Sequence, residues 1–318
     1  MRRVRSEADP AVLADRVLAG DRRAIARAIS LLEDGHIVGS ALLARLFPHA
    51  GNARTLGLTG PPGVGKSSLI SALCGHIRAN DQTVGVLSVD PSSHLTHGAL
   101  LGDRIRLSEH FLDPGVFIRS MGTRGHLGGV AEATMLAGIV LDASGRDVVV
   151  FETVGVGQSE VEISSLADTV VLVLMPGSGD SIQALKAGVM EIPDIIVINK
   201  ADQGGLDRLR GELTQILGLA EPEQRPTVVE TVATAGAGVP AFWKAVCAHR
   251  NDLVQRGLLA GRKRDQAERE LVTLALARLS RRLEVSLRER GDLAEVVDRV
   301  VARERDPLTA VDELLAGL

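Results

Sequence analysis

The amino-acid sequence predicts an α/β fold, in which a doubly wound, mostly parallel sheet carries helical extensions at its N- and C-terminal ends. Two observations lead to this prediction. Short runs rich in Val, Ile and Leu alternate with segments of helix length between about residues 54 and 232, and this alternation is typical of parallel sheets. The runs are apolar throughout, as in strands that helices cover on both faces. They span residues 55–59, 84–89, 116–119, 148–152, 170–175, 195–199 and 228–232.

The composition argues against several classes of protein. Of the 318 residues, 45% are hydrophobic and 24% are charged, as expected of a globular chain. Aromatic residues make up only 2%, so the core must be aliphatic, and stacking platforms for single-stranded nucleic acid are disfavoured. The net charge of −4 also argues against a protein that binds polyanions. We therefore expect no nucleic-acid partner.

Cysteine usage and the first residues bear on location. Cys74 and Cys247 form no CxxC pair, which argues against a disulfide framework or a cysteine zinc site and favours a reducing cytosol. The basic start of the chain is not followed by an apolar run of signal-peptide length. The strongest apolar stretch, residues 170–175, is too short to span a bilayer. We expect a cytoplasmic protein that does not contact membranes.

Residues 1–50 are predicted to form an N-terminal helical arm. Apolar residues recur with helical spacing from 11 to 47, and Gly20, Gly35 and Gly39 divide this pattern into two or three short helices. Pro48 and Gly51 mark a break before the sheet begins.

A phosphate-binding loop follows the first predicted strand. Residues 60–67 read G-x-x-x-x-G-K-S, and an amphipathic helix comes next. Glycines at these positions let backbone N–H groups turn toward phosphates at the N-terminus of that helix. Lys66 is expected to reach the β- and γ-phosphate oxygens and to be catalytic, and the Ser67 hydroxyl is expected to bind Mg²⁺. The predicted nucleotide-binding residues here are Gly60, Pro61, Pro62, Gly63, Val64, Gly65, Lys66, Ser67 and Ser68.

An N-K-x-D motif at the end of the run 195–199 favours GTP over ATP. Asp202 can accept hydrogen bonds from both N1–H and the exocyclic amine of guanine, a donor pair that adenine lacks. Asn199 is expected to hold the loop and the N7 edge of the base, and the Lys200 stem to pack over the ring. The turn at Thr234 and Ala235 is expected to contact the guanine oxygen.

Carboxylates at two further strand ends are candidate catalytic and metal residues. Asp90 follows the run 84–89, where it can hold a Mg²⁺-bound water or orient the attacking water; an N-cap role is the alternative. Glu152 ends the run 148–152, and Gly155 follows three residues later, where its N–H can contact the γ-phosphate. Asp103 and the segment 119–129 are candidate switch loops or ordinary surface loops.

The strands stop at about residue 256. Residues 262–290 have a helical pattern with an apolar stripe, and this segment is basic, whereas residues 291–318 are acidic. The pattern fits either a solvated pair of amphipathic helices or an arm for dimerisation or partner docking. The domain organisation predicted is therefore an N-terminal arm over 1–50, a nucleotide-binding domain over 51–255 and a C-terminal helical dimerisation arm over 256–318.

Seven segments together resemble the methylmalonyl-CoA mutase-associated GTPases, the MeaB/ArgK type of P-loop G-protein chaperones for adenosylcobalamin-dependent acyl-CoA mutases. With the N-terminal helices and the closing DPLTAVDELL, the resemblance covers nearly the whole chain. The segments are GPPGVGKSS, VDPSS, LGDRIR, FIRSMGTRGHLGG, FETVGVGQSE, MPGSGDSIQALKAG and INKAD.

This resemblance implies a P-loop GTPase domain and a homodimer held largely by C-terminal helices. The implied function is GTP hydrolysis that gates loading of intact cofactor into the mutase and ejection of damaged cofactor. It further implies that Asp90, Asp103 and Glu152 form the acidic catalytic and metal set, and that residues 177–188, with Gln183 and Lys186, respond to the mutase. Arg124-Gly-His replaces the Ser-Gly-Thr of some relatives, so the resemblance assigns no roles to residues 123–126.

Two other functions are compatible with the fold. A nickel-insertion metallochaperone GTPase would need a relay of His or Cys, whereas the eight His are scattered and the two Cys lie far apart. A kinase-like component of basic amino-acid transport would need a phosphoacceptor pocket with a general base.

Overall fold

The computed structural model describes residues 9–90, 107–122, 129–153, 166–177, 193–218, 221, 223, 225–289 and 291–316. The chain divides into two compact units, residues 1–270 and residues 271–318. Within the described residues, no helix combines the length and the apolar character needed to cross a membrane.

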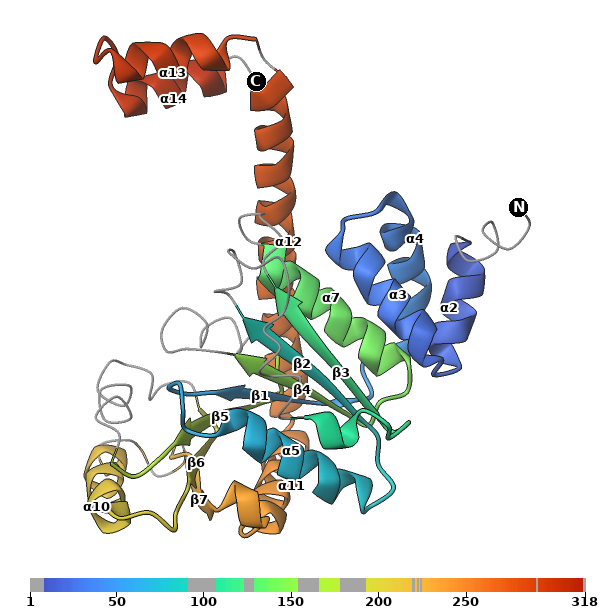
Figure 1. Ribbon diagram of the computed structural model, residues 1–318, viewed down its shortest axis with the longest axis vertical. Helices are drawn as coiled ribbons and strands as arrows, with labels where there is room; N and C mark the ends of the chain where they lie inside the picture. Colours follow the sequence, from blue (N-terminus) through green and yellow to red (C-terminus); the bar gives the residue numbers. More distant parts are fainter. Residues whose placement is uncertain are drawn as a thin grey trace. The chain divides into compact units, whose positions relative to one another are not determined.

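The described strands of the first unit form one seven-stranded sheet, ordered β3-β2-β4-β1-β5-β6-β7, in which every pair is parallel (Figure 1). Each apolar run of the sequence is a strand, which confirms the predicted α/β class. The third strand continues three residues beyond its predicted end. The strands are β1 Arg54–Thr59, β2 Val84–Asp90, β3 Val116–Gly122, β4 Val148–Thr153, β5 Thr169–Leu174, β6 Ile195–Asn199 and β7 Thr227–Thr231.

Helices cover both faces of this sheet, which explains why the strands are apolar on both sides. Alternate residues of β5 lie on opposite faces of the sheet. Val171 and Val173 pack with α5 and α11, whereas Leu172 and Leu174 pack with α10. The face on which Val170 lies also packs against α7. The covering helices are α5 Lys66–Arg78, α7 Gly129–Ala143, α10 Leu206–Leu217 and α11 Val239–Gln255, and the short turns are η1 Phe47–His49, η3 Ser108–His110 and η6 Ala233–Ala235.

The N-terminal residues form three helices that share a core with α7 and the sheet. Asp21 caps the second helix through its side chain, which accepts from the backbone N–H groups of Arg23 and Ala24. Arg119 of β3 binds Glu33 and donates to Ser30 of the same helix. The helices are α2 Pro10–Leu18, α3 Arg22–Glu33 and α4 Ile37–Leu46.

The single tryptophan lies at the opposite side of the sheet from these helices. Trp243 of α11 is 8% exposed and belongs to the core cluster of α5 and α11. The guanidinium of Arg54, the first residue of β1, stands 5.8 Å from the centre of its ring. This cation–π contact therefore lies at the amino end of the sheet.

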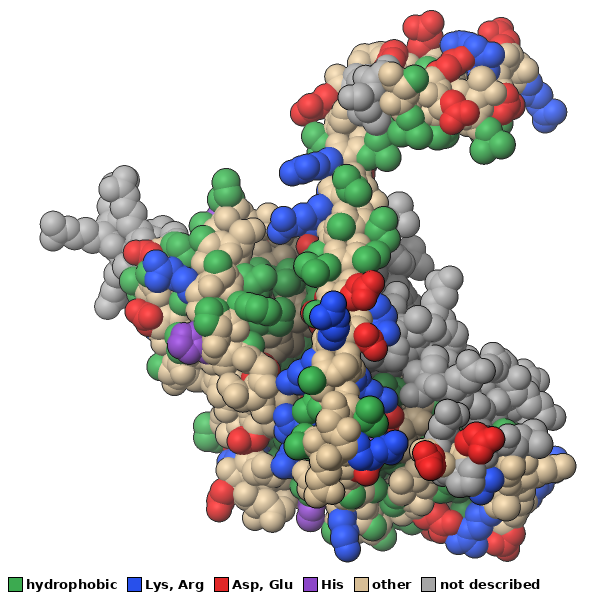
Figure 2. Space-filling model, turned by 180° about the vertical axis from the view of Figure 1, so that it is seen from behind, with side chains coloured by type: hydrophobic (Ala, Val, Ile, Leu, Met, Phe, Trp, Pro, Cys, Tyr) green, Lys and Arg blue, Asp and Glu red, His purple; other side chains and the backbone are tan. Residues whose placement is uncertain are grey.

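A 32-residue helix, α12 Leu258–Glu289, begins in the first unit and ends in the second. In the second unit it is followed by α13 Leu293–Val301 and α14 Pro307–Ala316. Arg299 of α13 and Arg305 both bind Glu313 of α14. Apolar side chains are exposed along these helices, as Figure 2 shows for α12. They are Leu258, Leu271, Val272, Leu276, Leu279, Val285, Val297, Val301, Leu308, Val311 and Leu315.

Candidate functional site

The candidate site lies at the carboxyl edge of the sheet, where β1 runs into a glycine-rich loop and then into α5. Three glycines of this loop have positive φ: +143° at Gly60, +79° at Gly63 and +92° at Gly65. A Cβ on Gly60 would lie 2.2 Å from the carbonyl oxygen of Val173, and one on Gly65 would lie 2.5 Å from Nδ2 of Asn199. The loop thus needs glycine both for its backbone conformation and for its close approach to β5 and β6.

Lys66 is the first residue of α5, and its side chain returns over the loop. Its Nζ donates to the carbonyl oxygens of Gly60 at 2.6 Å and Pro61 at 3.0 Å, and the residue is 6% exposed. The N-terminus of α5 adds partial positive charge to that of the ammonium group. This corner of the molecule therefore has the chemistry of an anion site.

Glu152 is held from two directions at the end of β4. Ser67 donates to its Oε1 at 2.7 Å, and Ser88 of β2 donates to its Oε2 at 2.9 Å. The register explains this arrangement, since Glu152 is paired with Leu58 of β1 on one side and with Ser88 on the other. Glu152 is 3% exposed, so a buried acidic group lies beside the glycine-rich loop.

Asn199 joins three segments through one side-chain amide. Its Nδ2 donates to the carbonyl oxygen of Val64 at 2.9 Å, while its Oδ1 accepts from Thr231 and from the backbone N–H of Ala233, both at 3.1 Å. The prediction that Asn199 holds the loop agrees with these contacts. Both ends of the amide are engaged within the protein, and its contact with a base remains a prediction.

The other residues of the predicted base site lie in the turns that Asn199 joins or next to them. Lys200 has a φ of +56°, and its Nζ donates to the carbonyl oxygen of Gly63 at 2.8 Å. Asp202 lies in the exposed turn after β6, and Thr234 and Ala235 lie exposed in η6, which follows β7. The structure therefore brings the glycine-rich loop and the predicted base-binding turns to one edge of the sheet.

Several predicted site residues cannot be compared with the structure. Asp90 ends β2 in register with Gly122 of β3, and its side chain is not among those described. Asp103, Gly155, residues 123–126, and Gln183 with Lys186 lie outside the described residues. Among the residues that are described, no group of three His, Cys, Asp or Glu could hold a metal ion.

Ser88 is a site residue that sequence reasoning missed. It is 3% exposed and is the one hydroxyl in the otherwise apolar run 84–89. A buried polar side chain needs a partner, so a hydroxyl two residues before a strand-terminal Asp was a usable signal.

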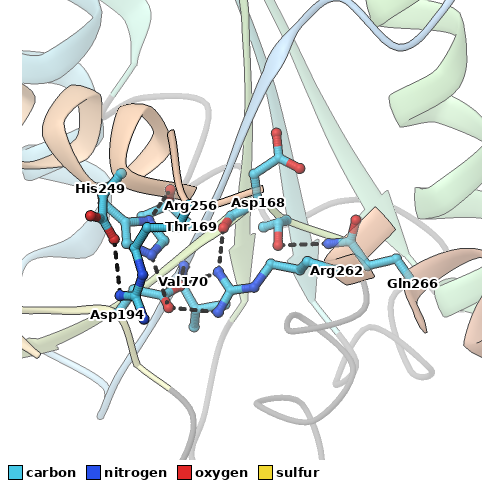
Figure 3. A network of polar contacts seen from close by, with 10 residues as sticks. Asp168, Thr169, Val170, Asp194, His249, Arg256, Arg262 and Gln266 are labelled. Atoms are coloured by element: carbon cyan, nitrogen blue, oxygen red, sulfur yellow. Dashed lines mark hydrogen bonds and ion pairs between the residues drawn. The ribbon is translucent and has the colours of Figure 1, made fainter. Parts of the chain in front are cut away.

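A second polar network, also missed, lies at the opposite edge of the sheet (Figure 3). Asp194, just before β6, accepts two hydrogen bonds from Arg262 of α12, at 2.8 and 3.0 Å. Nε2 of His249 of α11 lies 3.2 Å from Oδ1 of the same carboxylate, at ion-pair distance. Its Oδ2 also accepts from the backbone N–H of Val170 at 2.8 Å. Burial raises the pKa of Asp194, but the hydrogen bonds from His249 and Arg262 outweigh burial and hold that pKa below its ordinary value.

Comparison with known proteins identifies the family of the chain. The family model described as methylmalonyl Co-A mutase-associated GTPase MeaB matches residues 25–287, which include the glycine-rich loop, Glu152 and the N-K-x-D turn. A Pyrococcus abyssi protein, whose name gives GTPase activity as provisional, is 47% identical over 308 residues, with 95% of each chain covered.

Two further relatives extend the comparison. The mouse protein named methylmalonic aciduria type A homolog, mitochondrial, is 34% identical over 271 residues, which cover 79% of this chain and 65% of the mouse protein. A crystal structure described as that of a LAO/AO transport system kinase superposes with a TM-score of 0.71 at 26% identity, covering 97% of each chain. The loop, the sheet order and these similarities together show that the chain is a P-loop GTPase and belongs to the methylmalonyl Co-A mutase-associated GTPase family MeaB.

Proposed function

We propose that this GTPase is a chaperone that gates the loading of adenosylcobalamin into a B12-dependent acyl-CoA mutase of the methylmalonyl-CoA mutase type, and that protects and reactivates that mutase. The observation that carries the proposal is the family match over residues 25–287, because the family is described by its association with this mutase. The name of the mouse relative, which refers to methylmalonic aciduria, supports the same assignment.

The phosphates of GTP would lie in the loop from Gly60 to Ser68. Backbone N–H groups of the loop and of the first turn of α5 would donate to the phosphate oxygens. The Lys66 ammonium, held by two loop carbonyls, would bind the β- and γ-phosphate oxygens and stabilise the charge that develops during hydrolysis. Gly155 would offer its N–H to the γ-phosphate and so distinguish GTP from GDP.

A Mg²⁺ ion fits the donor set beside this loop. The Ser67 hydroxyl and the Glu152 carboxylate present oxygen atoms 2.7 Å apart, and oxygen is the ligand atom that Mg²⁺ prefers. When bound, the ion would neutralise charge on the phosphate oxygens. Ser67, Asp90, Asp103 and Glu152 are the proposed metal set, and the three carboxylates, with Lys66, are the proposed catalytic set.

The base would be read at the other end of the site. Asp202 would accept from guanine N1–H and from the exocyclic amine, and the Lys200 stem would pack over the ring. Thr234 and Ala235 would contact the guanine oxygen. Asn199 would keep these turns in place relative to the phosphates, because it bonds Val64 of the loop and Ala233 of η6 at once.

The C-terminal helices would hold two copies of the chain together. The exposed apolar side chains of α12, α13 and α14 support this proposal, since large apolar surfaces commonly mark interfaces. Light scattering should give twice the chain mass of 33.6 kDa. Replacing both Leu276 and Leu279 by Glu should give the monomer mass, and an unchanged dimer would contradict this interface.

The chaperone role can be tested with an apo mutase. We expect adenosylcobalamin transfer from a donor protein to the mutase to depend on GTP and to be blocked by a non-hydrolysable analogue. Lys66→Ala should abolish GTP hydrolysis and the nucleotide dependence together. Transfer that is indifferent to nucleotide, combined with a GTPase rate that none of the candidate mutases changes, would overturn the proposal.

One alternative keeps a specific observation in its favour. The similar crystal structure is described as that of a transport system kinase. This similarity favours a role as a kinase-like component of basic amino-acid transport. Radiolabelled γ-phosphate separates the two functions. Release of the label as inorganic phosphate supports the GTPase chaperone, whereas its transfer to a protein or an amino acid supports the kinase.

A further inference from the structure

A cavity of about 270 Å³ lies in the first unit, beside the amino ends of β1 and β5. Its described lining includes Ala53 just before β1, Thr55 within β1, and Leu166 and Asp168 just before β5. None of the nucleotide-site residues contributes to this lining. The cavity is therefore separate from the GTP site.

Two helices each present one continuous stripe to this cavity. On α7 the stripe has the spacing i, i+3, i+4, i+7, and α12 repeats the same spacing with mostly polar residues. Gly138 at the centre of the α7 stripe leaves room for Phe151 of β4, because a Cβ there would lie 2.8 Å from the end of the Phe151 ring. The stripes are Met135, Gly138, Ile139 and Asp142 on α7, and Lys263, Gln266, Ala267 and Glu270 on α12.

A buried carboxylate in the lining lacks a hydrogen-bond donor. Asp168 is 3% exposed, and its Oδ2 has no hydrogen-bond partner within the described part of the chain. Its closest cation is Arg250, whose Nε stands 3.8 Å from Oδ2, beyond hydrogen-bond length. Arg262 donates instead to the backbone oxygen of Asp168 at 2.6 Å, and in Figure 3 the carboxylate points away from Arg262.

A second carboxylate in the lining also has no partner among the described residues. Glu270 is half-buried, without a hydrogen bond or ion pair, and burial raises its pKa. Asp142 differs, because its oxygens accept from the backbone N–H groups of Gly51, Asn52 and Ala53 at 2.6 to 3.1 Å. Lys263 is the cation of the described lining, and its Nζ donates to the carbonyl oxygen of Gly51 at 3.2 Å.

We propose that this cavity binds a small organic cation, one with an ammonium or guanidinium head on a compact apolar body. The head would donate to Asp168 and Glu270, whose oxygens lack donors, and such charge-assisted hydrogen bonds are about twice as strong as neutral ones. The body would lie against the apolar walls, which include Met135, Ile139 and Phe151. Two carboxylates that lack hydrogen-bond donors disfavour an anion. Beside a neutral head, Glu270 would keep an uncompensated charge, and Asp168 would keep only its 3.8 Å ion pair with Arg250.

Benzylammonium and benzyl alcohol form a matched pair of probes, since they have the same body and differ in the charge of the head. Ligand-observed NMR on the full chain at neutral pH should show saturable binding of benzylammonium. We expect at least tenfold weaker binding of benzyl alcohol. Absence of saturable benzylammonium binding, or equal affinity for the two probes, would overturn the proposal.

Variants locate the site. Glu270→Gln should weaken benzylammonium binding at least tenfold, and Ala267→Leu, which fills the cavity, should abolish it. Glu268→Gln changes an exposed residue of the same helix outside the cavity, and it should bind as the wild type does. Asp168→Asn should also weaken binding, but this buried variant can fail to fold; Glu270→Gln then decides, and an undiminished affinity there rejects the site. GTP hydrolysis by each variant reports that the chain is folded.

Discussion

The hydroxyl of Ser67 and the carboxylate of Glu152 are joined by a 2.7 Å hydrogen bond, and the other carboxylate oxygen is held by Ser88 at 2.9 Å. Glu152→Gln keeps this shape but removes the charge. We expect single-turnover GTP hydrolysis to fall about 100-fold, the order of loss seen when one electrostatic stabiliser is removed. Ser88→Ala, which leaves the carboxylate in place, should lose less than tenfold. A Glu152→Gln rate equal to the wild type would refute the catalytic role of this carboxylate.

Asp202→Asn tests the proposed reading of guanine. The amide can accept one hydrogen bond but no longer accepts two, so GTP affinity should fall about 100-fold or more. Xanthosine triphosphate has a carbonyl oxygen where guanine has its amine, and the new amide N–H can donate to it, so its affinity should rise. Competition binding against a fluorescent nucleotide measures both changes. Guanine preference that survives the substitution would mean that the base is read elsewhere.

Asn199→Ala should act on stability as well as on binding. The variant leaves the Val64 carbonyl, the Thr231 hydroxyl and the Ala233 N–H without the partner they have in the folded chain. Each buried polar group left unpaired costs about 1–3 kcal/mol, so urea unfolding should show a loss of at least about 2 kcal/mol. Asp202→Ala, in the exposed turn three residues later, is the control and should unfold like the wild type.

Arg262→Ala should destabilise the protein in a manner that depends on pH. The folded pKa of Asp194 lies below its ordinary value because of His249 and Arg262, despite burial. Its interactions therefore stabilise the fold above the unfolded pKa, near 3.8, and this stabilisation disappears as the pH falls through the folded pKa. Breaking such a pair costs about 3 kcal/mol. The deficit in urea unfolding should be full at pH 7 and smaller at pH 3.

The exposed Arg264 offers a matched control for this measurement, because it lies on the same helix and takes no part in the hydrogen bonds and ion pairs that the described residues make with Asp194. Arg264→Ala should match the wild type at both pH values. A deficit in Arg262→Ala that is the same at pH 7 and pH 3 would show that its cost comes from packing rather than from the carboxylate.

The two cysteines should differ in reactivity. Burial raises the pKa of the Cys74 thiol to about 12, and the thiolate is the form that alkylating reagents attack. Cys247 is only half-buried. Iodoacetamide at pH 8 should therefore label Cys247 first, as mass spectrometry of tryptic peptides will show. Cys247→Ser should take up label only when the protein is unfolded, and rapid labelling of that folded variant would contradict the burial of Cys74.

The strands and the phosphate loop were predictable because their signals are local. Apolar runs such as 195–199 indicate strands buried on both faces. The glycines from Gly60 to Gly65 predict a loop, and the structure has a loop at these positions. The network around Asp194 was not predictable. Arg262 lies 68 residues further along the chain, and only the packing of α12 on the amino edge of the sheet brings the two together.

The scarcity of aromatic residues gives the protein a built-in optical probe. With one tryptophan and no tyrosine in the chain, intrinsic fluorescence excited at long ultraviolet wavelength comes from Trp243. That indole lies beside Arg54, the residue that opens β1, whereas the nucleotide loop follows the other end of the same strand. Its emission will therefore follow the opening of the fold during denaturation while leaving the optical window of fluorescent guanine nucleotides free, so that both events can be recorded in one sample.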